Sequence, residues 1–186
     1  MDPVSAKLEA ELQAKLAKQE KDNKEPVDLK PIASWDFEND AVDAIGGVEG
    51  ELKGTARLDG GALVVDGGGA FFSEPFDRNL RAKTLEALVQ LDTLQQRAGG
   101  AMTVQDLSGG AFDSIVFAER RSNEWMAGSS GFRRTADFGA PGDTEAAERP
   151  VRIIIAYEED GTIRGYRDGK PLGKYKKELQ PYSPGQ

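Results

Sequence analysis

The sequence predicts an all-β protein, a β-sandwich of antiparallel sheets with an N-terminal α-helix in front of it. From Ile32 onward the composition shifts to glycine and to residues that favour strands. Short segments recur between Gly-rich and Asp-rich turns, and this spacing is typical of a sandwich rather than of alternating strands and helices. Residues 84–92 give the clearest two-faced strand, because Leu85, Ala87 and Val89 alternate with mostly polar neighbours.

Residues 1–24 differ from the rest of the chain and predict a charged amphipathic helix. Leu8, Leu12 and Leu16 repeat at four-residue spacing among Lys and Glu, which makes a narrow apolar stripe. A helix of about 20 residues is marginal in isolation. We therefore expect the stripe to dock on a partner, on the sandwich or on a second copy of the chain. The segment is too short to establish a coiled coil.

Residues 25–31 (EPVDLKP) predict a linker, because two prolines end the helix and favour an extended chain. The domain is then expected to span residues 32–186. Charges interrupt every would-be apolar core near the N-terminus, so this chain carries no predicted signal peptide. No apolar run approaches the roughly 18 residues that a membrane helix needs.

In the first half of the domain, glycine and aspartate mark the turns. Asp59-Gly60-Gly61 and the run of three glycines after Asp66 supply the positive φ angles that tight turns require. The predicted strands between these turns are residues 32–37, 50–58, 62–66, 70–73 and 84–92.

In the second half, hairpin turns are predicted at Glu159-Asp160-Gly161 and at Asp168-Gly169. The strand between them should pair on both sides in a meander. Residues 137–149 form a long polar loop, and the last residues, 174–186, carry no strong strand pattern. The predicted strands are residues 101–105, 112–119, 124–128, 151–157 and 162–167.

The overall charge and the missing residue types exclude several function classes. The net charge of −8 argues against a nucleic-acid partner, which requires clustered Lys and Arg. The chain has no His and no Cys, so it cannot build a Ser-His or Cys-His nucleophile, a Cys/His zinc site or a haem attachment. Any metal would be a hard, oxygen-liganded ion such as calcium. The absence of cysteine leaves the redox compartment open.

The stretch from Phe112 to Thr135 concentrates aromatic and charged residues on two predicted strands and a loop. The first strand alternates, so we expect different environments on its two faces. Aromatic faces stack on sugars while charged groups bond to hydroxyls, and the cluster therefore predicts a sugar-binding surface. Alternatively, the indole belongs to the core and the charges form solvated ion pairs. The candidate ligand-binding residues are Asp113, Glu119, Arg120, Trp125, Arg133 and Arg134.

Six strings carry a resemblance to a known family: WDFEND (35–40), GGALVVDGGGAF (60–71), KTLEALVQLD (83–92), FDSIVFAER (112–120), WMAGSSGFRRT (125–135) and DGTIRGYRDGKPLGKYK (160–176). With these strings the chain resembles the concanavalin A-like, laminin-G-like domain of large planctomycete-type proteins that also carry cytochrome c and domains of unknown function. The resemblance implies a jelly roll of two antiparallel sheets. It also implies an exported parent protein, and thus an extracytoplasmic location.

The chain departs from the family pattern at two places. Leu88 stands where the family commonly has Trp, so a sugar platform at that position is not expected. The family's closing strands would follow Gln186, and we expect the sheet to have an open edge without them.

Domains of this family bind glycans, proteins or calcium, and a subset are glycoside hydrolases. The hydrolases place acids at alternate positions of one strand, as in ExDxE, and no ExDxE occurs here. For calcium the candidate ligands are Asp36, Asp40 and Asp43, which lie close together in sequence and could instead form a solvated acidic turn. Glu145, in the long loop, is a candidate to cover Arg133 and Arg134.

Two functions from different classes remain. The first is a non-catalytic carbohydrate-binding, lectin-like module that targets a larger exported protein to polysaccharide. The second is a protein-interaction domain that packs against flanking domains of its parent. An exposed Trp125 would favour the first function, and a Trp125 buried among apolar side chains would favour the second.

Overall fold

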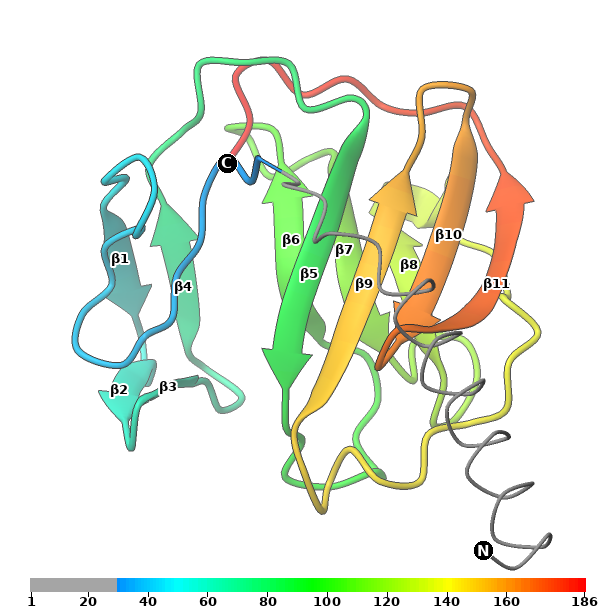
Figure 1. Cartoon of the computed structure of the whole chain (residues 1–186), viewed down its shortest axis with the longest axis horizontal. Helices are drawn as coiled ribbons and strands as arrows, with labels where there is room; N and C mark the ends of the chain where they lie inside the picture. The colour runs from blue at the N-terminus through cyan, green and yellow to red at the C-terminus, as the bar shows by residue number, and fades with distance from the viewer. Residues whose placement is uncertain (1–29) are drawn as a thin grey trace, which may run out of the picture.

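The computed structural model describes residues 30–186, so the helix predicted for residues 1–24 lies outside the described residues. Within the described part, eleven strands form several antiparallel sheets, and only a single 3₁₀ turn, Ser130–Phe132, interrupts the all-β architecture (Figure 1). The all-β prediction is confirmed. No helix among residues 30–186 is long and apolar enough to cross a membrane.

The largest sheet has four strands in the order β11-β10-β9-β5. Gly161 and Gly169, both at positive φ, allow the tight turns that join its last three strands. The meander predicted around residues 162–167 is confirmed, since β10 pairs with both neighbours. The sequence predicted no strong strand from residue 174 onward. This prediction is wrong for residues 174–176, which belong to β11. The strands are β5 (Lys83–Val89), β9 (Val151–Tyr157), β10 (Thr162–Arg167) and β11 (Lys170–Lys176).

A three-stranded sheet, in the order β6-β7-β8, lies against the first. β7 was expected to have two different faces, but every residue from Asp113 to Phe117 is buried. Ile115 and Phe117 face the core, and the flanking strands cover the other face, where Thr103 of β6 hydrogen-bonds to Ser114. The strands are β6 (Gly100–Gln105), β7 (Phe112–Phe117) and β8 (Trp125–Ser129).

Two short ladders complete the fold at the N-terminal side of the described chain. The strand predicted for residues 32–37 is wrong: Phe37 lies at a left-handed φ of 59°, and the segment is irregular. Its aromatic side chains pack instead on Phe71, whose ring centre lies 5.6 Å from Trp35 and 5.1 Å from Phe37. The ladders pair β1 (Gly50–Lys53) with β4 (Ala70–Ser73) and β2 (Arg57–Asp59) with β3 (Ala62–Val64).

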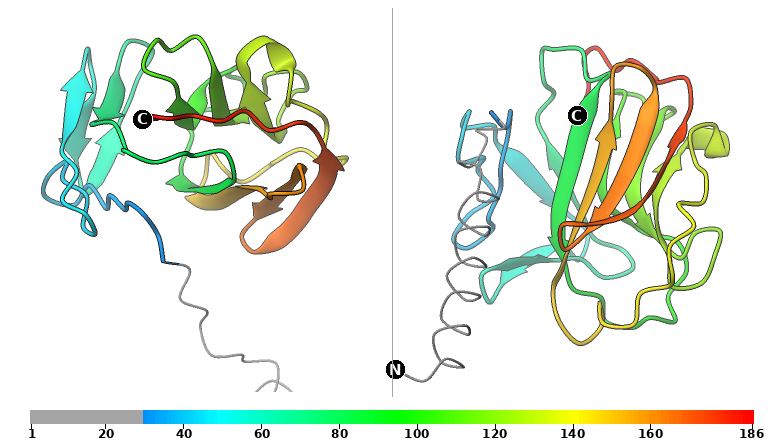
Figure 2. Two further views of the ribbon diagram at one scale, coloured as in Figure 1. Left: turned by 90° about the horizontal axis from the view of Figure 1, so that it is seen from above. Right: turned by 45° about the vertical axis from the view of Figure 1, so that its right-hand side comes forward.

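The two larger sheets form the layers of a sandwich-like arrangement with one core between them (Figure 2). Apolar side chains from both sheets are almost completely buried there, because their alternate residues point to the same interior. The four-stranded sheet contributes Leu85, Ile153 and Ile155, and the other contributes Ile115 and Phe117.

After β11 the chain crosses the end of the sandwich as an irregular C-terminal tail, residues 177–186. Tyr182 accepts a hydrogen bond from the Leu80 amide, and Gly185 accepts one from the Phe76 amide. Gln186 exchanges two backbone hydrogen bonds with Gln105. The tail thus ends between the segment that follows β4 and the end of β6 (Figures 1 and 2).

Candidate functional site

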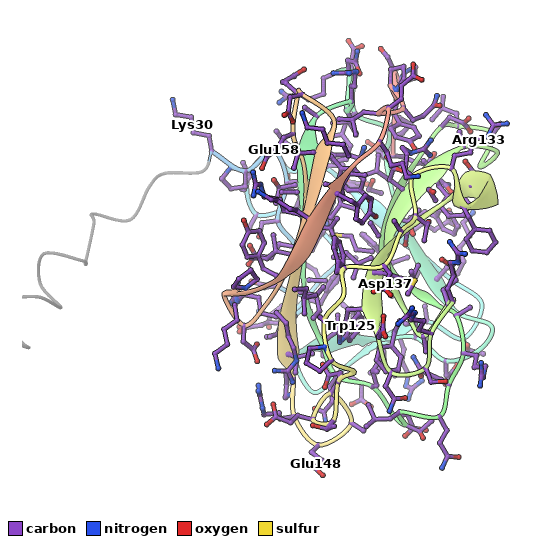
Figure 3. All side chains as sticks on the ribbon, turned by 90° about the vertical axis from the view of Figure 1, so that its right-hand side faces the viewer. Lys30, Trp125, Arg133, Asp137, Glu148 and Glu158 are labelled. Carbon is purple, nitrogen blue, oxygen red and sulfur yellow. The ribbon has the colours of Figure 1, made fainter. Side chains whose placement is uncertain are left out.

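The six predicted ligand-binding residues do not form one surface. Asp113, Trp125 and Arg134 are buried, whereas Arg120 and Arg133 are exposed and Glu119 is half-buried. In Figure 3 Trp125 lies within the molecule and Arg133 projects from its surface. The stretch from Phe112 to Thr135 therefore divides into an interior and an exterior part.

Asp113 is the centre of the interior part. Lys83 Nζ donates to its Oδ2 at 2.7 Å, and Arg134 Nε donates to its Oδ1 at 2.5 Å. All three side chains are 5% exposed or less. These ion pairs join β5, β7 and the loop after β8, so they link the two sheets across the core. The Asp113 carboxylate lies between two cations and is not exposed to solvent, so it stabilises the fold and cannot accept a hydrogen bond from a ligand at the surface.

Two tyrosines complete the environment of this charged group. The Lys83 ammonium lies 4.3 Å from the ring centre of Tyr157 and 4.8 Å from that of Tyr182. Burial lowers the pKa of Lys83, and the ion pair with Asp113 opposes that effect. Burial also raises the pKa of Tyr157 far above its ordinary value. Tyr182 accepts a hydrogen bond from Arg134, so the C-terminal tail is attached to the same group.

Trp125 is held by a second buried carboxylate, that of Asp143. The indole Nε1 donates to Asp143 Oδ2 at 2.8 Å, and Arg167 Nε donates to the same oxygen at 2.6 Å. The amides of Glu145 and Ala146 donate to the other oxygen. Burial would raise the pKa of Asp143, but these donors, with Arg167 first among them, lower it to about 2.

The indole of Trp125 is only 5% exposed, and its centre lies 4.9 Å from that of Phe117. A ring in this position cannot stack on a sugar without opening the core. This burial is the condition that favours an interaction domain over a lectin-like module. Glu145 does not cover Arg133 or Arg134, since its carboxylate pairs with Arg149 and Arg167.

The exterior part surrounds a pocket of about 360 Å³. Arg120 lies over the half-exposed ring of Phe132, with 5.5 Å between the guanidinium carbon and the ring centre. Arg121 pairs with Asp137 at 2.9 Å. Lys177 forms no ion pair within residues 30–186 and adds a further positive charge. The pocket is lined by Arg120, Arg121, Met126, Thr135, Ala136, Asp137 and Lys177.

Glu119 borders this exterior part but points into the protein. Its Oε2 atom is buried and has no hydrogen-bond partner within residues 30–186. Burial raises the pKa of the Glu119 carboxyl, and the charge of Arg120 partly opposes the shift. A carboxyl that takes up a proton more readily is a weaker acceptor for sugar hydroxyls than an exposed carboxylate.

The three candidate calcium ligands each organise their own loop. Asp43 is buried and accepts backbone hydrogen bonds from Ser34, Ile45 and Gly46, which lower its pKa against the effect of burial. Asp36 and Asp40 each accept a bond from the amide two residues further on. Among residues 30–186, no group of three or more acidic side chains is arranged to hold a metal ion.

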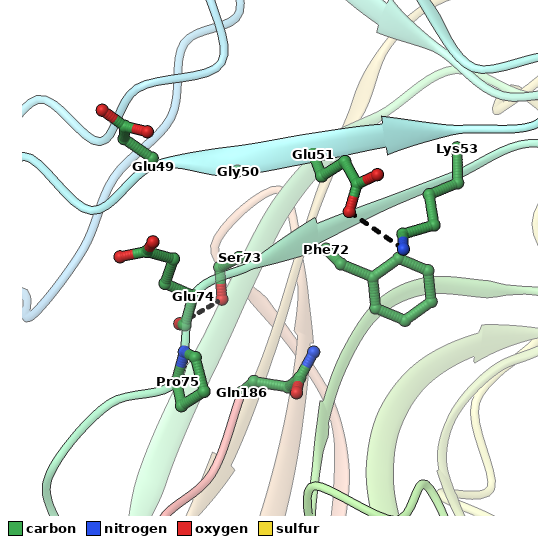
Figure 4. Close-up of a pocket in the computed structure, with 9 residues that line it drawn as sticks. All are labelled: Glu49, Gly50, Glu51, Lys53, Phe72, Ser73, Glu74, Pro75 and Gln186. Atoms are coloured by element: carbon green, nitrogen blue, oxygen red, sulfur yellow. Dashed lines mark hydrogen bonds and ion pairs between the residues drawn. The ribbon is translucent and has the colours of Figure 1, made fainter.

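A second pocket, of about 450 Å³, lies at the margin of the β1–β4 ladder, where the C-terminal tail ends (Figure 4). Phe72 is 37% exposed and lies under Lys53, which pairs with Glu51. Glu49 and Glu74 have no ion-pair partner in the described part of the chain. This pocket could not be predicted from the sequence, because strand pairing between distant segments leaves no local signal.

The same reason explains why Lys83 and Asp143 were missed as partners of the predicted site. Lys83 lies 30 residues from Asp113 and Asp143 lies 18 residues from Trp125, and neither belongs to a recognisable motif. No family model, curated protein or solved structure matches the chain.

Proposed function

We propose that this chain is a non-catalytic interaction domain that binds a polypeptide partner, either a flanking domain of a parent protein or another chain. The observation that carries the proposal is the burial of Trp125, Asp113 and Arg134, each of which is hydrogen-bonded inside the protein. The residues that look most suited to a sugar therefore stabilise the sandwich. At the surface, the margin beside the C-terminal tail combines a pocket with the edges of strands.

The margin has the features of a polypeptide-binding surface. Phe72 supplies an exposed apolar ring, and the pocket of about 450 Å³ lies beside it. Among residues 30–186, β4 pairs with a strand only on its β1 side, and β6 only on its β7 side. Unpaired backbone donors and acceptors on such edges are satisfied by an added strand, a common mode of peptide recognition.

The non-catalytic assignment rests on the state of the buried acids. Asp113 and Asp143 are buried, and each accepts hydrogen bonds from an arginine and from at least one other donor, so neither carboxylate is accessible to a substrate. A concanavalin A-like jelly roll is the form of sandwich that we propose for this domain. An exported parent protein is part of the same proposal.

The experiment is a side-by-side binding screen of the folded chain on an array of extended peptides and on an array of algal and bacterial polysaccharides. We expect peptides to bind and neutral glycans not to bind. Each array is repeated with a calcium chelator, which should leave peptide binding unchanged. Binding to neutral glycans alone would contradict the proposal.

A second candidate function, carbohydrate binding, is supported by the positively charged pocket. Arg120, Arg121 and Lys177 would attract a carboxylated or sulfated sugar, and the Phe132 ring offers an exposed face for stacking. The test is binding of acidic polysaccharides to the chain and to an Arg120→Ala, Lys177→Ala variant. Binding that is lost in the folded variant would support a lectin-like module, and binding that persists would exclude this pocket.

A further inference from the structure

The C-terminal tail defines a direction and a spacing at the margin between β4 and β6. Gly185 forms antiparallel bridges with Phe76 on one side and with Asp106 on the other. At the C-terminal ends of β4 and β6, the space between the two flanking segments is therefore as wide as one extended chain, that of Gly185. Since Gln186 continues by pairing with Gln105, a strand in line with the tail runs antiparallel to both β4 and β6.

On the β4 side, the backbone groups that face this space can be identified from the register. Glu74 donates to the Glu49 carbonyl, so this opposite pair is hydrogen-bonded. In an antiparallel ladder hydrogen-bonded and non-hydrogen-bonded pairs alternate. The amides of Phe71 and Ser73 therefore point away from β1 and toward the space.

On the β6 side, the backbone groups that face this space follow from the pairing with the tail. The Gln105 amide donates to Gln186 rather than to β7. Two residues earlier, the Thr103 amide must point to the same side, because successive residues of a strand direct their backbone groups to alternate sides. Within residues 30–186 no strand pairs with these edges of β4 and β6 beyond the tail.

We propose that the margin between β4 and β6, which we call the strand slot, binds an extended segment of a partner protein as an added strand antiparallel to both. This inference rests on the proposed function and names its site. The strand slot is bounded by the facing edges of Ala70–Ser73 and Gly100–Gln105. An added strand there would join the β1–β4 ladder to the three-stranded sheet.

The chemistry of the partner follows from the two faces of the strand slot. Met102 and Val104 point to the core but remain partly exposed, so the partner should present apolar side chains at alternate positions inward. Its outward positions should be polar. Near the tail, Glu49 and Glu74 leave negative charge at the entrance, which favours a basic residue at the partner's N-terminal end.

The test is an NMR titration of the ¹⁵N-labelled chain with a designed peptide. The probe has blocked ends and about seven residues, a typical strand length, with a lysine followed by alternating valine and threonine. We expect amide shifts and slowed hydrogen exchange at Phe71, Ser73 and Thr103. The same peptide with N-methylated valines lacks every donor toward one flanking strand and should bind about tenfold more weakly or worse.

A proline at Thr103 removes the donor of β6 that faces the strand slot. Thr103→Pro should therefore weaken peptide binding, whereas Lys174→Pro, at an outward position of edge strand β11, should not. Both variants are first checked for folding by circular dichroism, and the N-methylated peptide tests the same point on the unaltered chain.

The outcomes separate the two proposals. Peptide binding that shifts amides elsewhere, or that survives N-methylation, would overturn the strand slot and leave polypeptide binding intact. If the chain self-associated without peptide through the facing edges of β4 and β6, the partner would be a second copy of the chain, and the proposed binding of another protein would be overturned. If no peptide on the array binds, the proposed function itself fails.

Discussion

The residues with the strongest chemical signal in this sequence are the ones that the fold buries. Asp113 and Asp143 each lie under several donors, and each is neutralised by an arginine that is distant in sequence. The types of residue in a candidate site could be read from the sequence, but their accessibility could not. Burial depends on which strand becomes central, and the alternation in residues 112–119 gave no indication that both faces of β7 would be covered.

Removing the Asp113 carboxylate should strongly destabilise the fold. Asp113→Ala leaves Lys83 and Arg134 buried without a counter-charge, and the loss of one partner from such a group typically costs about 3–5 kcal/mol. The measurement is the free energy of unfolding in urea. As the matched control, Lys176→Ala removes an exposed ion pair with Asp160 and should leave stability unchanged within error. Equal effects of the two variants would contradict the buried role of Asp113.

Asp143 should make the stability depend on pH in the acidic range. Its pKa is about 2 in the folded protein, below its ordinary value of 3.8, so the stabilisation is complete above about pH 5 and is lost as the pH falls toward 2. The shift corresponds to roughly 2 kcal/mol. Urea unfolding of the chain and of Asp143→Asn at several pH values measures this contribution. The difference between them should shrink toward pH 2, and a constant difference would contradict the assignment.

At the scale of the strands and turns, the sequence predicted most of the fold. Strands that lie between clear Gly and Asp turns, such as 151–157 and 162–167, were placed correctly. The strand predicted for residues 32–37 was wrong because its aromatic residues serve tertiary packing on Phe71. Local patterns predict pairing only when the partner is near in the chain, and the C-terminal tail pairs with segments that are far away.

Close packing between β7 and β8 predicts a strong effect of one added methyl group. A Cβ atom at Gly128 would lie 2.6 Å from Val116 Cγ1, so Gly128→Ala should overpack the sheet and lower stability by about 1–3 kcal/mol. Gly99→Ala is the control, because a Cβ there meets no atom within 4 Å. Thermal unfolding compares the two. If Gly128→Ala left the melting temperature unchanged, β8 would be packed less tightly against Val116 than the structure indicates.

At the scale of the whole molecule, the sandwich is held by groups that cross between its parts. The charged cluster joins β5, β7 and the tail, and the tail in turn bonds to the segment after β4 and to β6. Within residues 30–186, no strand pairing joins β4 directly to β6. The buried charged cluster therefore stabilises the fold, whereas the margin between β4 and β6 is the site that we propose for recognition of a partner.

Deleting residues 183–186 should loosen the margin without unfolding the core. The deletion removes the backbone bonds to Phe76 and Gln105 and retains Tyr182 with its bond to Arg134. A loss of about 1–3 kcal/mol is expected from the missing hydrogen bonds. Hydrogen exchange should accelerate at Phe76 and Gln105 and stay slow in β7. If the shortened chain unfolded completely, residues 183–186 would contribute more to the stability of the core than we expect.

Residue-resolved hydrogen exchange of the unliganded chain at low concentration measures the interior and the strand slot in one experiment. We expect slow exchange for the β7 amides, which lie beside the charged cluster, and fast exchange for Phe71, Ser73 and Thr103 at the strand slot. Slow exchange at those three amides would mean that the edges are already paired. Fast exchange in β7 would mean that the ion-paired interior does not hold the sandwich together.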